Sequence, residues 1–171
     1  MKQLTIKELL QVQLDILRDV DAFCRQNQID YFLVGGTGIG AVRHGGYIPW
    51  DDDIDIGMTR PNYDRFLSSF NGNYSNLELY APEIDLNYYA PYANVCDNRT
   101  LLFEGANGHR KDKIGVKIDI FPFDGVPGDE LTFDKLRTES RKLSGKLWWK
   151  RRLFGKSTLR HDAKQVIMKS S

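Results

Sequence analysis

The sequence predicts an α/β (α+β) protein whose mixed sheet is flanked by helices, and three observations support this fold class. Apolar residues recur at helical spacing over residues 6–26, whereas residues 53–56 and 114–121 alternate polar and apolar side chains as strands do. Helical and strand-like segments follow one another with short connections. The chain has 171 residues, 41% of them hydrophobic and 27% charged, which is typical of a globular domain with or without an appendage.

Composition narrows the class of protein. No apolar run is long enough to cross a bilayer, and an acid as early as Glu8 does not fit a signal peptide, so we expect a cytoplasmic protein. Cys24 and Cys96 are too few for a disulfide framework and form no C-x-x-C pair. We interpret both as reduced, structural thiols.

Charge is distributed unevenly along the chain. Residues 1–134 carry 12 Lys and Arg against 21 Asp and Glu, a net charge of −9, whereas residues 135–171 carry 12 against 2, a net charge of +10. The acidic first part argues against nucleic acid as a partner. The basic end fits either a solvated helix face or contact with an anionic membrane, at whose inner face the protein would then lie.

A long helix is predicted over residues 6–26. Thr5 and Glu8 have the spacing of a capping box, in which each side chain binds the backbone amide of the other residue. Apolar residues then recur on one helical face: Leu9, Leu10, Ile16, Leu17, Val20, Phe23 and Cys24. The opposite face is charged, and we expect it to be solvated.

The second helix follows a glycine turn. Residues 29–34 are rich in β-forming residues and end at Gly35-Gly36, which predicts a strand, a tight turn and a short helix over residues 37–44. Gly45-Gly46 closes that helix, because glycine readily adopts the left-handed conformation found at helix ends.

An acidic strand comes next. Tyr47 and Ile48, directly before Pro49, cannot be helical, so residues 47–50 are expected to be extended. Asp53-Ile-Asp-Ile56 alternates, so Asp53 and Asp55 share one strand face and the isoleucines share the other. Thr59 and Pro61 predict the start of another helix. Its buried face comprises Tyr63, Phe66, Leu67 and Phe70.

The second half of the chain is predicted to contain further strands and one helix. The clearest strand patterns cover residues 77–80, 92–96 and 114–121. Residues 101–103 are expected to extend the second of these, and Pro122 and Pro127 are expected to end the third. A helix is predicted over residues 130–150. Its apolar face contains Leu136, Leu143 and Leu147, and residues 155–171 have at best a weak helical pattern.

The acids Asp53 and Asp55 indicate a metal site. They are roughly 6.5–7 Å apart along one strand face, where unpaired carboxylates would repel one another. A divalent cation, Mg²⁺ or Mn²⁺, removes this repulsion and takes oxygen ligands from carboxylates and substrate phosphates. Asp119 is the candidate third carboxylate, because it is also an acid between apolar residues in an alternating strand.

The Gly35-Gly36 turn is a candidate phosphate site. Backbone amides at a helix N-terminus bind anions, and a phosphate held there could lie against the metal. A metal, a phosphate-binding turn and a third acid are together suited to phosphoryl or nucleotidyl transfer.

Each feature also has a simpler alternative. A Gly-Gly pair is most often only a turn, and Asp51–Asp53 could form a solvated loop. Counted from Asp51, loop positions six and twelve are Ile56 and Asn62 rather than Gly and Glu, which argues against an EF-hand. Asp53-Ile-Asp55 also fits the D-x-D pattern of metal-dependent glycosyltransferases. Asp119 could simply stabilise an edge strand or a turn.

The combination of motifs resembles that of a known family. The stretch Gly35-Gly-Thr-Gly-Ile-Gly-Ala-Val-Arg-His-Gly-Gly-Tyr-Ile-Pro-Trp-Asp-Asp-Asp-Ile-Asp55 closely resembles the signature of the LicD family, and Val116-Lys-Ile-Asp-Ile-Phe-Pro122 resembles its second motif. These proteins are phosphorylcholine transferases of bacterial surface polysaccharides, related to fukutin-type proteins. The resemblance covers roughly residues 5–127 and implies a polymerase-β-like nucleotidyltransferase fold.

The resemblance also implies an activity. It implies Mg²⁺-dependent transfer of a substituted phosphate, such as phosphocholine, from a CDP-linked donor such as CDP-choline. The acceptor would be a sugar hydroxyl of a cell-surface polysaccharide, lipopolysaccharide or teichoic acid, free or lipid-linked. Asp53 and Asp55 would hold the metal, and Asp119 would bind metal or accept the proton of the attacking hydroxyl.

The remaining residues of the stretch have supporting roles in this interpretation. Gly35, Gly36 and Thr37 would bind the donor phosphate, and Arg43 would balance its charge or brace the aspartates. Asp51 and Asp52 would shape the loop or form outer contacts. Trp50 would either stack on a base or pack, and we favour packing.

The end of the chain departs from the family pattern. Family members continue with an aromatic, Tyr-Gly-Asp-containing segment that residues 128–171 do not contain. We expect residues 1–128 to form the catalytic core and residues 129–171 to form a basic, partly helical segment of a truncated or short form. The alternative functions are a D-x-D glycosyltransferase and an inactive, nucleotide-binding remnant.

Overall fold

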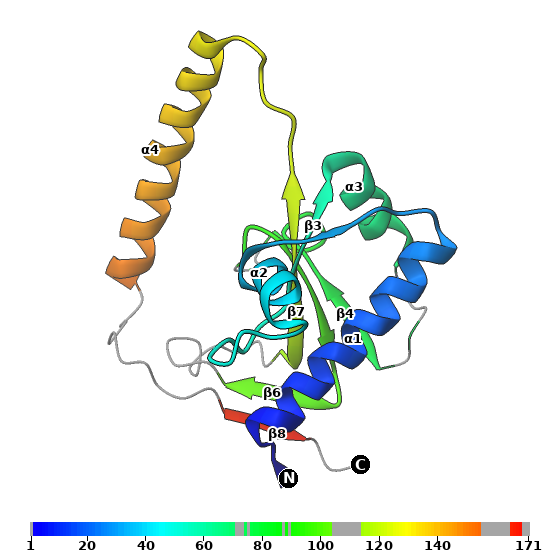
Figure 1. Cartoon of the computed structure of the whole chain (residues 1–171). Coiled ribbons are helices and arrows are strands. Elements are labelled where there is room, and N and C mark those ends of the chain that lie inside the picture. Colours follow the sequence, from blue (N-terminus) through cyan, green and yellow to red (C-terminus); the bar gives the residue numbers. More distant parts are fainter. Residues whose placement is uncertain are drawn as a thin grey trace.

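A five-stranded mixed sheet forms the centre of the computed structural model (Figure 1). In sheet order its strands are β2 (Phe32–Leu33), β3 (Asp55–Thr59), β7 (Val116–Phe123), β5 (Ala93–Asp97) and β4 (Leu77–Tyr80). Strands β3 and β7 are parallel, and the other neighbours are antiparallel. The structure describes residues 2–70, 74, 76–86, 88, 90–103, 114–154 and 165–168. The predicted fold class, a mixed sheet flanked by helices, is confirmed.

Helix α1 (Ile6–Gln26) has the predicted bounds and the predicted capping box. The Thr5 hydroxyl accepts a hydrogen bond from the Glu8 amide at 3.3 Å, and the Thr5 amide donates to the Glu8 carboxylate at 2.8 Å. The helix buries its apolar face against the sheet. Both Cys24 on this helix and Cys96 on β5 are buried and free, as the thiol interpretation requires.

The capping box gives the first testable prediction. Thr5→Ala is expected to lower the free energy of unfolding by about 1 kcal/mol, because the first turn of α1 loses the side-chain acceptor of the Glu8 amide. Urea denaturation measures the change. Thr138→Ala, on an exposed helical position, is the matched control and should leave stability within about 0.5 kcal/mol of wild type. Equal stability of the two variants would contradict the capping role.

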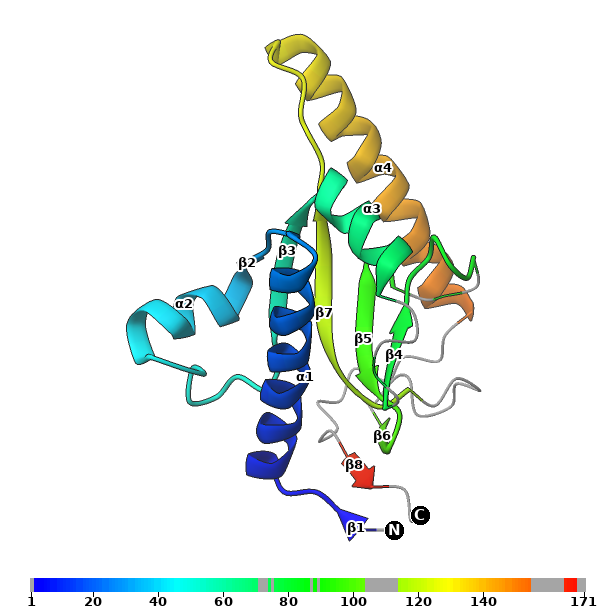
Figure 2. The ribbon, with the colours of Figure 1, turned by 90° about the vertical axis from the view of Figure 1, so that its right-hand side faces the viewer.

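Helix α3 (Arg60–Ser69) covers the same sheet face as α1 (Figure 2). Its predicted buried face is confirmed, and Pro61 lies in its first turn. Thr59 is the N-cap residue, but its side chain makes no capping hydrogen bond. The core between helices and sheet is formed by alternating strand residues: Ile54, Ile56, Met58, Val116, Ile118 and Ile120.

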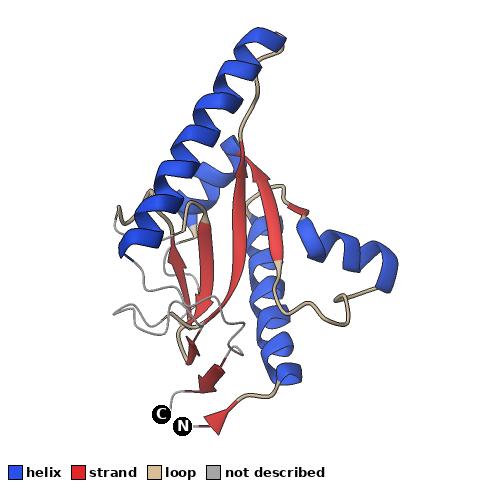
Figure 3. Ribbon diagram, turned by 90° about the vertical axis from the view of Figure 1, so that its left-hand side faces the viewer, coloured by secondary structure: helices blue, strands red, loops and turns tan. Residues whose placement is uncertain are grey.

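Helix α2 (Gly35–His44) projects from the β2 edge of the sheet (Figure 3). The helix begins at Gly35, two residues before the predicted start, so the glycine pair forms its first turn. Gly35 has a φ of +56° and Gly45, which ends the helix, has a φ of +65°. The preceding strand is shorter than the predicted residues 29–34, because its pairing with β3 covers Phe32 and Leu33, which lie opposite Gly57 and Ile56.

The acidic strand also begins later than predicted, at Asp55 rather than Asp53. The hydrogen bonding between this segment and β7 nevertheless extends one residue before β3, since the Asp119 amide donates to the Ile54 carbonyl at 2.9 Å. The predicted alternation of faces is confirmed: Ile54 and Ile56 are buried in the core, and Asp55 lies on the opposite face.

Pro122 does not end β7, contrary to the prediction. The Asp119 amide points toward β3, and amides alternate in direction along a strand, so the Pro122 nitrogen points toward β5. Pairing with β5 has already stopped there, at Ala93 opposite Ile120. The missing N–H of proline therefore removes no sheet hydrogen bond.

Residues 101–103 do not extend β5, which corrects a second prediction. They belong to β6 (Thr100–Phe103), which forms a separate three-stranded sheet with β1 (Lys2–Gln3) and β8 (Gln165–Met168). A turn at Asn98 and Arg99 separates β6 from the main sheet. The strand β8 also replaces the weak helical pattern expected there; the rest of residues 155–171 lies outside the described residues.

Helix α4 (Glu130–Phe154) follows β7 and stands clear of the main sheet (Figure 1). The predicted helix is confirmed and is four residues longer. Leu136 and Leu143, expected on its apolar face, are 49% and 60% exposed. Among the described residues, no helix has the length and apolar character needed to span a membrane.

Candidate active site

Asp55 and Asp119 lie directly opposite each other on the parallel strands β3 and β7. Both occupy the sheet face opposite the apolar core, because their neighbours Ile54, Ile118 and Ile120 point into that core. Asp119 is buried, with 8% of its surface exposed, and Asp55 is half-buried. The sheet register therefore brings together two acids that are more than sixty residues apart in sequence.

Asp119 is held by two donors on one of its oxygens. Asn94, its direct neighbour on β5, donates from Nδ2 to Oδ1 at 2.5 Å, and the Lys117 ammonium donates to the same atom at 2.5 Å. Asn94 is fully buried, and the Tyr88 hydroxyl donates to its Oδ1. Asn94 and Lys117 therefore fix the orientation of the Asp119 carboxylate.

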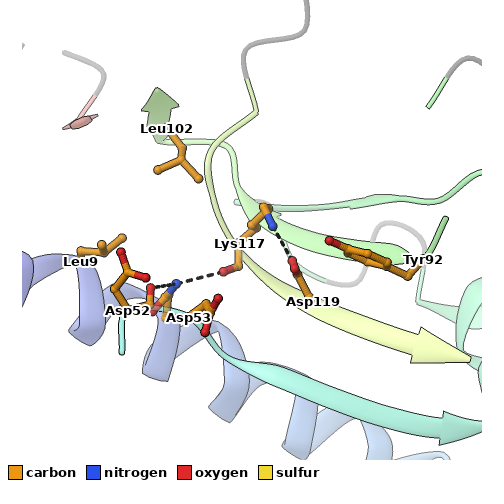
Figure 4. A pocket seen from close by; sticks show the side chains of 8 residues that line it. Leu9, Asp52, Asp53, Tyr92, Leu102, Lys117 and Asp119 are labelled. Atoms are coloured by element: carbon orange, nitrogen blue, oxygen red, sulfur yellow. Dashed lines mark hydrogen bonds and ion pairs between the residues drawn. The ribbon is translucent and has the colours of Figure 1, made fainter. Parts of the chain in front are cut away.

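A pocket of about 210 Å³ opens beside these residues (Figure 4). Asp53 and Lys117, each two residues before the Asp55–Asp119 pair, line it together with Asp119. The other lining residues are Leu9, Gln13, Asp52, Tyr92 and Leu102. Asp53 and Asp119 thus face a common cavity, whereas Asp55 lies behind them, against the glycine turn.

Gln13 ties this pocket to α1. It is 4% exposed, and its Nε2 donates to the Asp52 carbonyl at 3.1 Å and to the Lys117 carbonyl at 3.3 Å. The Tyr47 hydroxyl donates to Gln13 Oε1 at 3.2 Å. One buried amide therefore fixes the acidic loop against β7.

The glycine turn lies directly against two carboxylates. A Cβ on Gly35 would come within 3.0 Å of Asp55 Oδ2, and a Cβ on Gly36 would come within 2.1 Å of Asp51 Oδ2. The Thr37 hydroxyl accepts a hydrogen bond from the Asp55 amide at 2.8 Å. The structure thus places the N-terminus of α2 beside Asp51 and Asp55.

Burial and neighbouring charge raise the proton affinity of Asp55. Its pKa rises from 3.8 to about 6, first because of burial and then because of the nearby charges of Asp53 and Asp119, whereas the Lys117 ammonium opposes them. Oxygens of Asp51, Asp52 and Asp53 lie within 4.8 Å of one another. A dense set of carboxylate oxygens beside a carboxyl group whose pKa is raised fits a hard divalent cation such as Mg²⁺.

The closest carboxylate group is not the predicted ligand set. Among the described residues, the group compact enough to hold an ion is Asp51–Asp53, whereas the predicted ligands were Asp53, Asp55 and Asp119. Asp53 belongs to both sets. The assignment of Asp53, Asp55 and Asp119 as ligands stays a prediction. Asp51 and Asp52, which were predicted to shape the loop or form outer contacts, lie in the same compact carboxylate group as Asp53.

Two other predicted residues are exposed to solvent. Arg43 is exposed in the last turn of α2, at the opposite end from the glycine pair. Trp50 is 84% exposed, so the packing role that we favoured for it is wrong. An exposed indole remains available to a ligand, which was the other interpretation.

Four residues of the site were not predicted from the sequence: Gln13, Tyr92, Asn94 and Lys117. Two of them leave a signal in the sequence. Lys117 is two residues before Asp119 and therefore shares its strand face. Asn94 is a polar residue inside a short buried strand, where a polar group requires a partner. Gln13 and Tyr92 leave no such local signal.

Comparison with known proteins shows the family of this chain. The family described as LicD/FKTN/FKRP, nucleotidyltransferase domain, matches residues 28–144. The match includes the glycine turn, all the acids described above and the first part of α4. The chain belongs to this family.

Individual relatives show how far the similarity extends. The chain is 38% identical over 146 residues to the lipopolysaccharide cholinephosphotransferase LicD of Haemophilus influenzae, covering 84% of this chain and 53% of that protein. It is 53% identical over 30 residues to human ribitol 5-phosphate transferase FKRP, covering 18% of this chain and 6% of that protein. The chain thus spans about half the length of the bacterial relative.

Proposed function

We propose that this chain catalyses Mg²⁺-dependent transfer of a substituted phosphate, phosphocholine or a similar group, from a CDP-linked donor to a sugar hydroxyl. The acceptor would be a cell-surface polysaccharide, lipopolysaccharide or teichoic acid. One observation supports the proposal most strongly. Asp55 lies opposite Asp119 on the neighbouring strand and, at the same time, against the Gly35-Gly36 turn. The names of the two relatives, one acting on lipopolysaccharide and both transferring a phosphate-linked group, also support the proposal.

The roles of the residues follow from their positions. Asp53, Asp55 and Asp119 would hold the cation, which when bound would offset the negative charge of the donor phosphates. The amides of the first turn of α2 would bind the donor phosphate beside Asp55. Asp119, oriented by Asn94 and Lys117, would accept the proton from the attacking sugar hydroxyl or contribute a metal ligand.

A donor screen tests this proposal. The protein is incubated with CDP-choline, other CDP-alcohols or UDP-sugars, each with Mg²⁺, with Mn²⁺ and with EDTA, and released nucleotides are identified by mass spectrometry. Release of CMP from a CDP-alcohol, only when metal is present, is the expected result. Release of UDP instead would establish the D-x-D glycosyltransferase alternative. Nucleotide binding without turnover would establish the inactive remnant.

The donors around Asp119 give a second testable prediction. Asn94→Leu and Lys117→Met are each expected to lower turnover about 10- to 100-fold, the usual loss when a group that orients a catalytic carboxylate is removed. The Michaelis constant for the donor should change less than threefold, because neither residue belongs to the glycine turn. Initial rates of CMP release measure both constants.

The control for these variants is Lys7→Met, which removes an exposed ammonium from α1. It should leave both constants at wild-type values. Wild-type turnover in Lys117→Met would contradict the orienting role of Lys117. Melting curves show whether Asn94→Leu is folded at the assay temperature.

We further propose that the basic segment from residue 135 onward approaches an anionic membrane carrying a lipid-linked acceptor. Its net charge of +10 and the exposed leucines of α4 support this. Sedimentation with vesicles containing anionic lipid should show binding that weakens as salt is raised. Binding that is absent, or unaffected by salt, would contradict the proposal.

A further inference from the structure

Four aromatic side chains lie on β7 or on the chain segments that flank β3 and β7, next to the Asp55–Asp119 pair. They are Phe32 on β2, Phe121 and Phe123 on β7, and Tyr92 immediately before β5. We propose that this aromatic shelf binds the nucleobase of the donor. This inference rests on the proposed function, because it assigns a place to one part of a nucleotide-linked donor.

The sheet register places the shelf one strand repeat from the acids. Gly57 lies opposite Phe32 on one side and opposite Phe121 on the other. Asp55 and Asp119 form the equivalent pair two residues earlier on the same strands. Residues two apart share a face and are separated by roughly 6.5–7 Å, so the shelf and the acids lie on the same face at that spacing.

Gly57 allows the rings to lie directly on the sheet. A Cβ at this position would come within 2.6 Å of the Phe32 ring and 2.7 Å of the Phe123 ring. The two rings meet edge to face, with centroids 5.0 Å apart, and Tyr92 and Phe121 pair with centroids 4.4 Å apart. Bare backbone at Gly57 beneath these close-packed rings makes a preformed aromatic surface, on which a ring face or edge can contact a ligand.

The rings remain accessible in the folded chain. Phe32 is 42% exposed and Phe123 is 46% exposed, whereas the apolar residues of the opposite sheet face, such as Ile56 and Ile120, are fully buried. Large exposed aromatic groups beside a polar site are typical of ligand-binding surfaces. Here the adjoining site is the acidic cluster.

The position of the shelf favours a nucleobase as its occupant. Phe32 is three residues before Gly35, so the shelf borders the turn proposed to bind the donor phosphate. A nucleoside diphosphate held at that turn has its base within reach of this surface. Bases stack on aromatic side chains with little dependence on their identity, because every base has a flat face.

Isothermal titration of the whole chain with CDP and with inorganic pyrophosphate, both with Mg²⁺, tests the shelf. Phe32→Ala and Phe123→Leu are each expected to weaken CDP binding about tenfold, equivalent to about 1.4 kcal/mol. Pyrophosphate binding should stay within twofold of wild type, because the acids and the glycine turn are unchanged. Phe123→Tyr retains a flat ring and should retain CDP affinity.

Phe133→Ala provides the matched control, because Phe133 is 37% exposed on α4, away from the sheet. It should change neither affinity. Unchanged CDP affinity in both shelf variants, or an equal loss for CDP and pyrophosphate, would overturn the nucleobase assignment and leave the proposed reaction intact. Failure of the wild-type chain to bind CDP would overturn the shelf and the nucleotide donor together.

Discussion

Asp55→Asn is expected to abolish transfer and, in the metal-free protein, to stabilise the fold. The loss of turnover should be at least about 100-fold, because a bound metal ion contributes several kcal/mol of charge stabilisation. The gain in stability has a separate cause. Burial, together with the nearby charges of Asp53 and Asp119, raises the pKa of Asp55 to about 6, so the ionised carboxylate destabilises the folded state.

The sign of the pH dependence follows from the raised pKa of Asp55. Between pH values near 3.8 and 6, the folded protein binds this proton more tightly than the unfolded chain does. The contribution of Asp55 to stability therefore falls as pH rises through that range. Asparagine resembles the protonated form, so the variant should be more stable by roughly 1–2 kcal/mol above pH 6, after allowance for solvent screening.

Thermal melting in EDTA from pH 4 to pH 8 measures this effect. The difference in melting temperature between Asp55→Asn and wild type should grow with pH and level off above about pH 6. Added Mg²⁺ should stabilise wild type more than the variant. Asp30→Asn, on an exposed position, is the control. A pH-independent difference, or full activity in Asp55→Asn, would contradict the role given to this residue.

Gly115→Ala is expected to produce the largest loss of stability, about 3 kcal/mol. A Cβ at this position would come within 1.9 Å of the Asp97 carbonyl oxygen and 2.8 Å of the Thr100 hydroxyl. Neither atom can move easily, because the buried Thr100 hydroxyl donates to the Asp97 carbonyl and accepts from the Val116 amide. Overpacking against fixed backbone usually costs about 1–3 kcal/mol, and this contact is unusually short.

The loss should appear as a fall in melting temperature of about 6–12 °C for a chain of this length. Gly46→Ala is the matched control, because no atom lies within 4 Å of the place that its added methyl group would occupy and its φ is not positive. That variant should melt within about 2 °C of wild type. A melting temperature of Gly115→Ala equal to that of Gly46→Ala would show that the start of β7 can shift.

Much of the fold could be predicted because its signals are local. The capping box of Thr5 and Glu8 and the apolar periodicity give the bounds of α1 directly. The alternation around Asp55 and Asp119 indicates which faces of β3 and β7 carry the acids. Each of these features depends on residues within a few positions of one another, so a single sequence is enough to identify it.

The errors concern partners that are distant in sequence. Pro122 was expected to end its strand, but its effect depends on where β5 stops pairing. Asn94 and Gln13 became site residues only through contacts with strands and loops far along the chain. The exposure of Trp50 likewise depends on what surrounds it. Local patterns do not specify these pairings.

The mass of an acceptor glycan tests the central proposal most directly. Purified lipopolysaccharide is incubated with the protein, CDP-choline and Mg²⁺, and its mass is compared with that after incubation in EDTA or with Asp55→Asn. The account predicts that the acceptor gains one phosphocholine for each CMP released, and only with wild-type protein and metal. CMP release without a modified acceptor, or the same gain with Asp55→Asn, would contradict it.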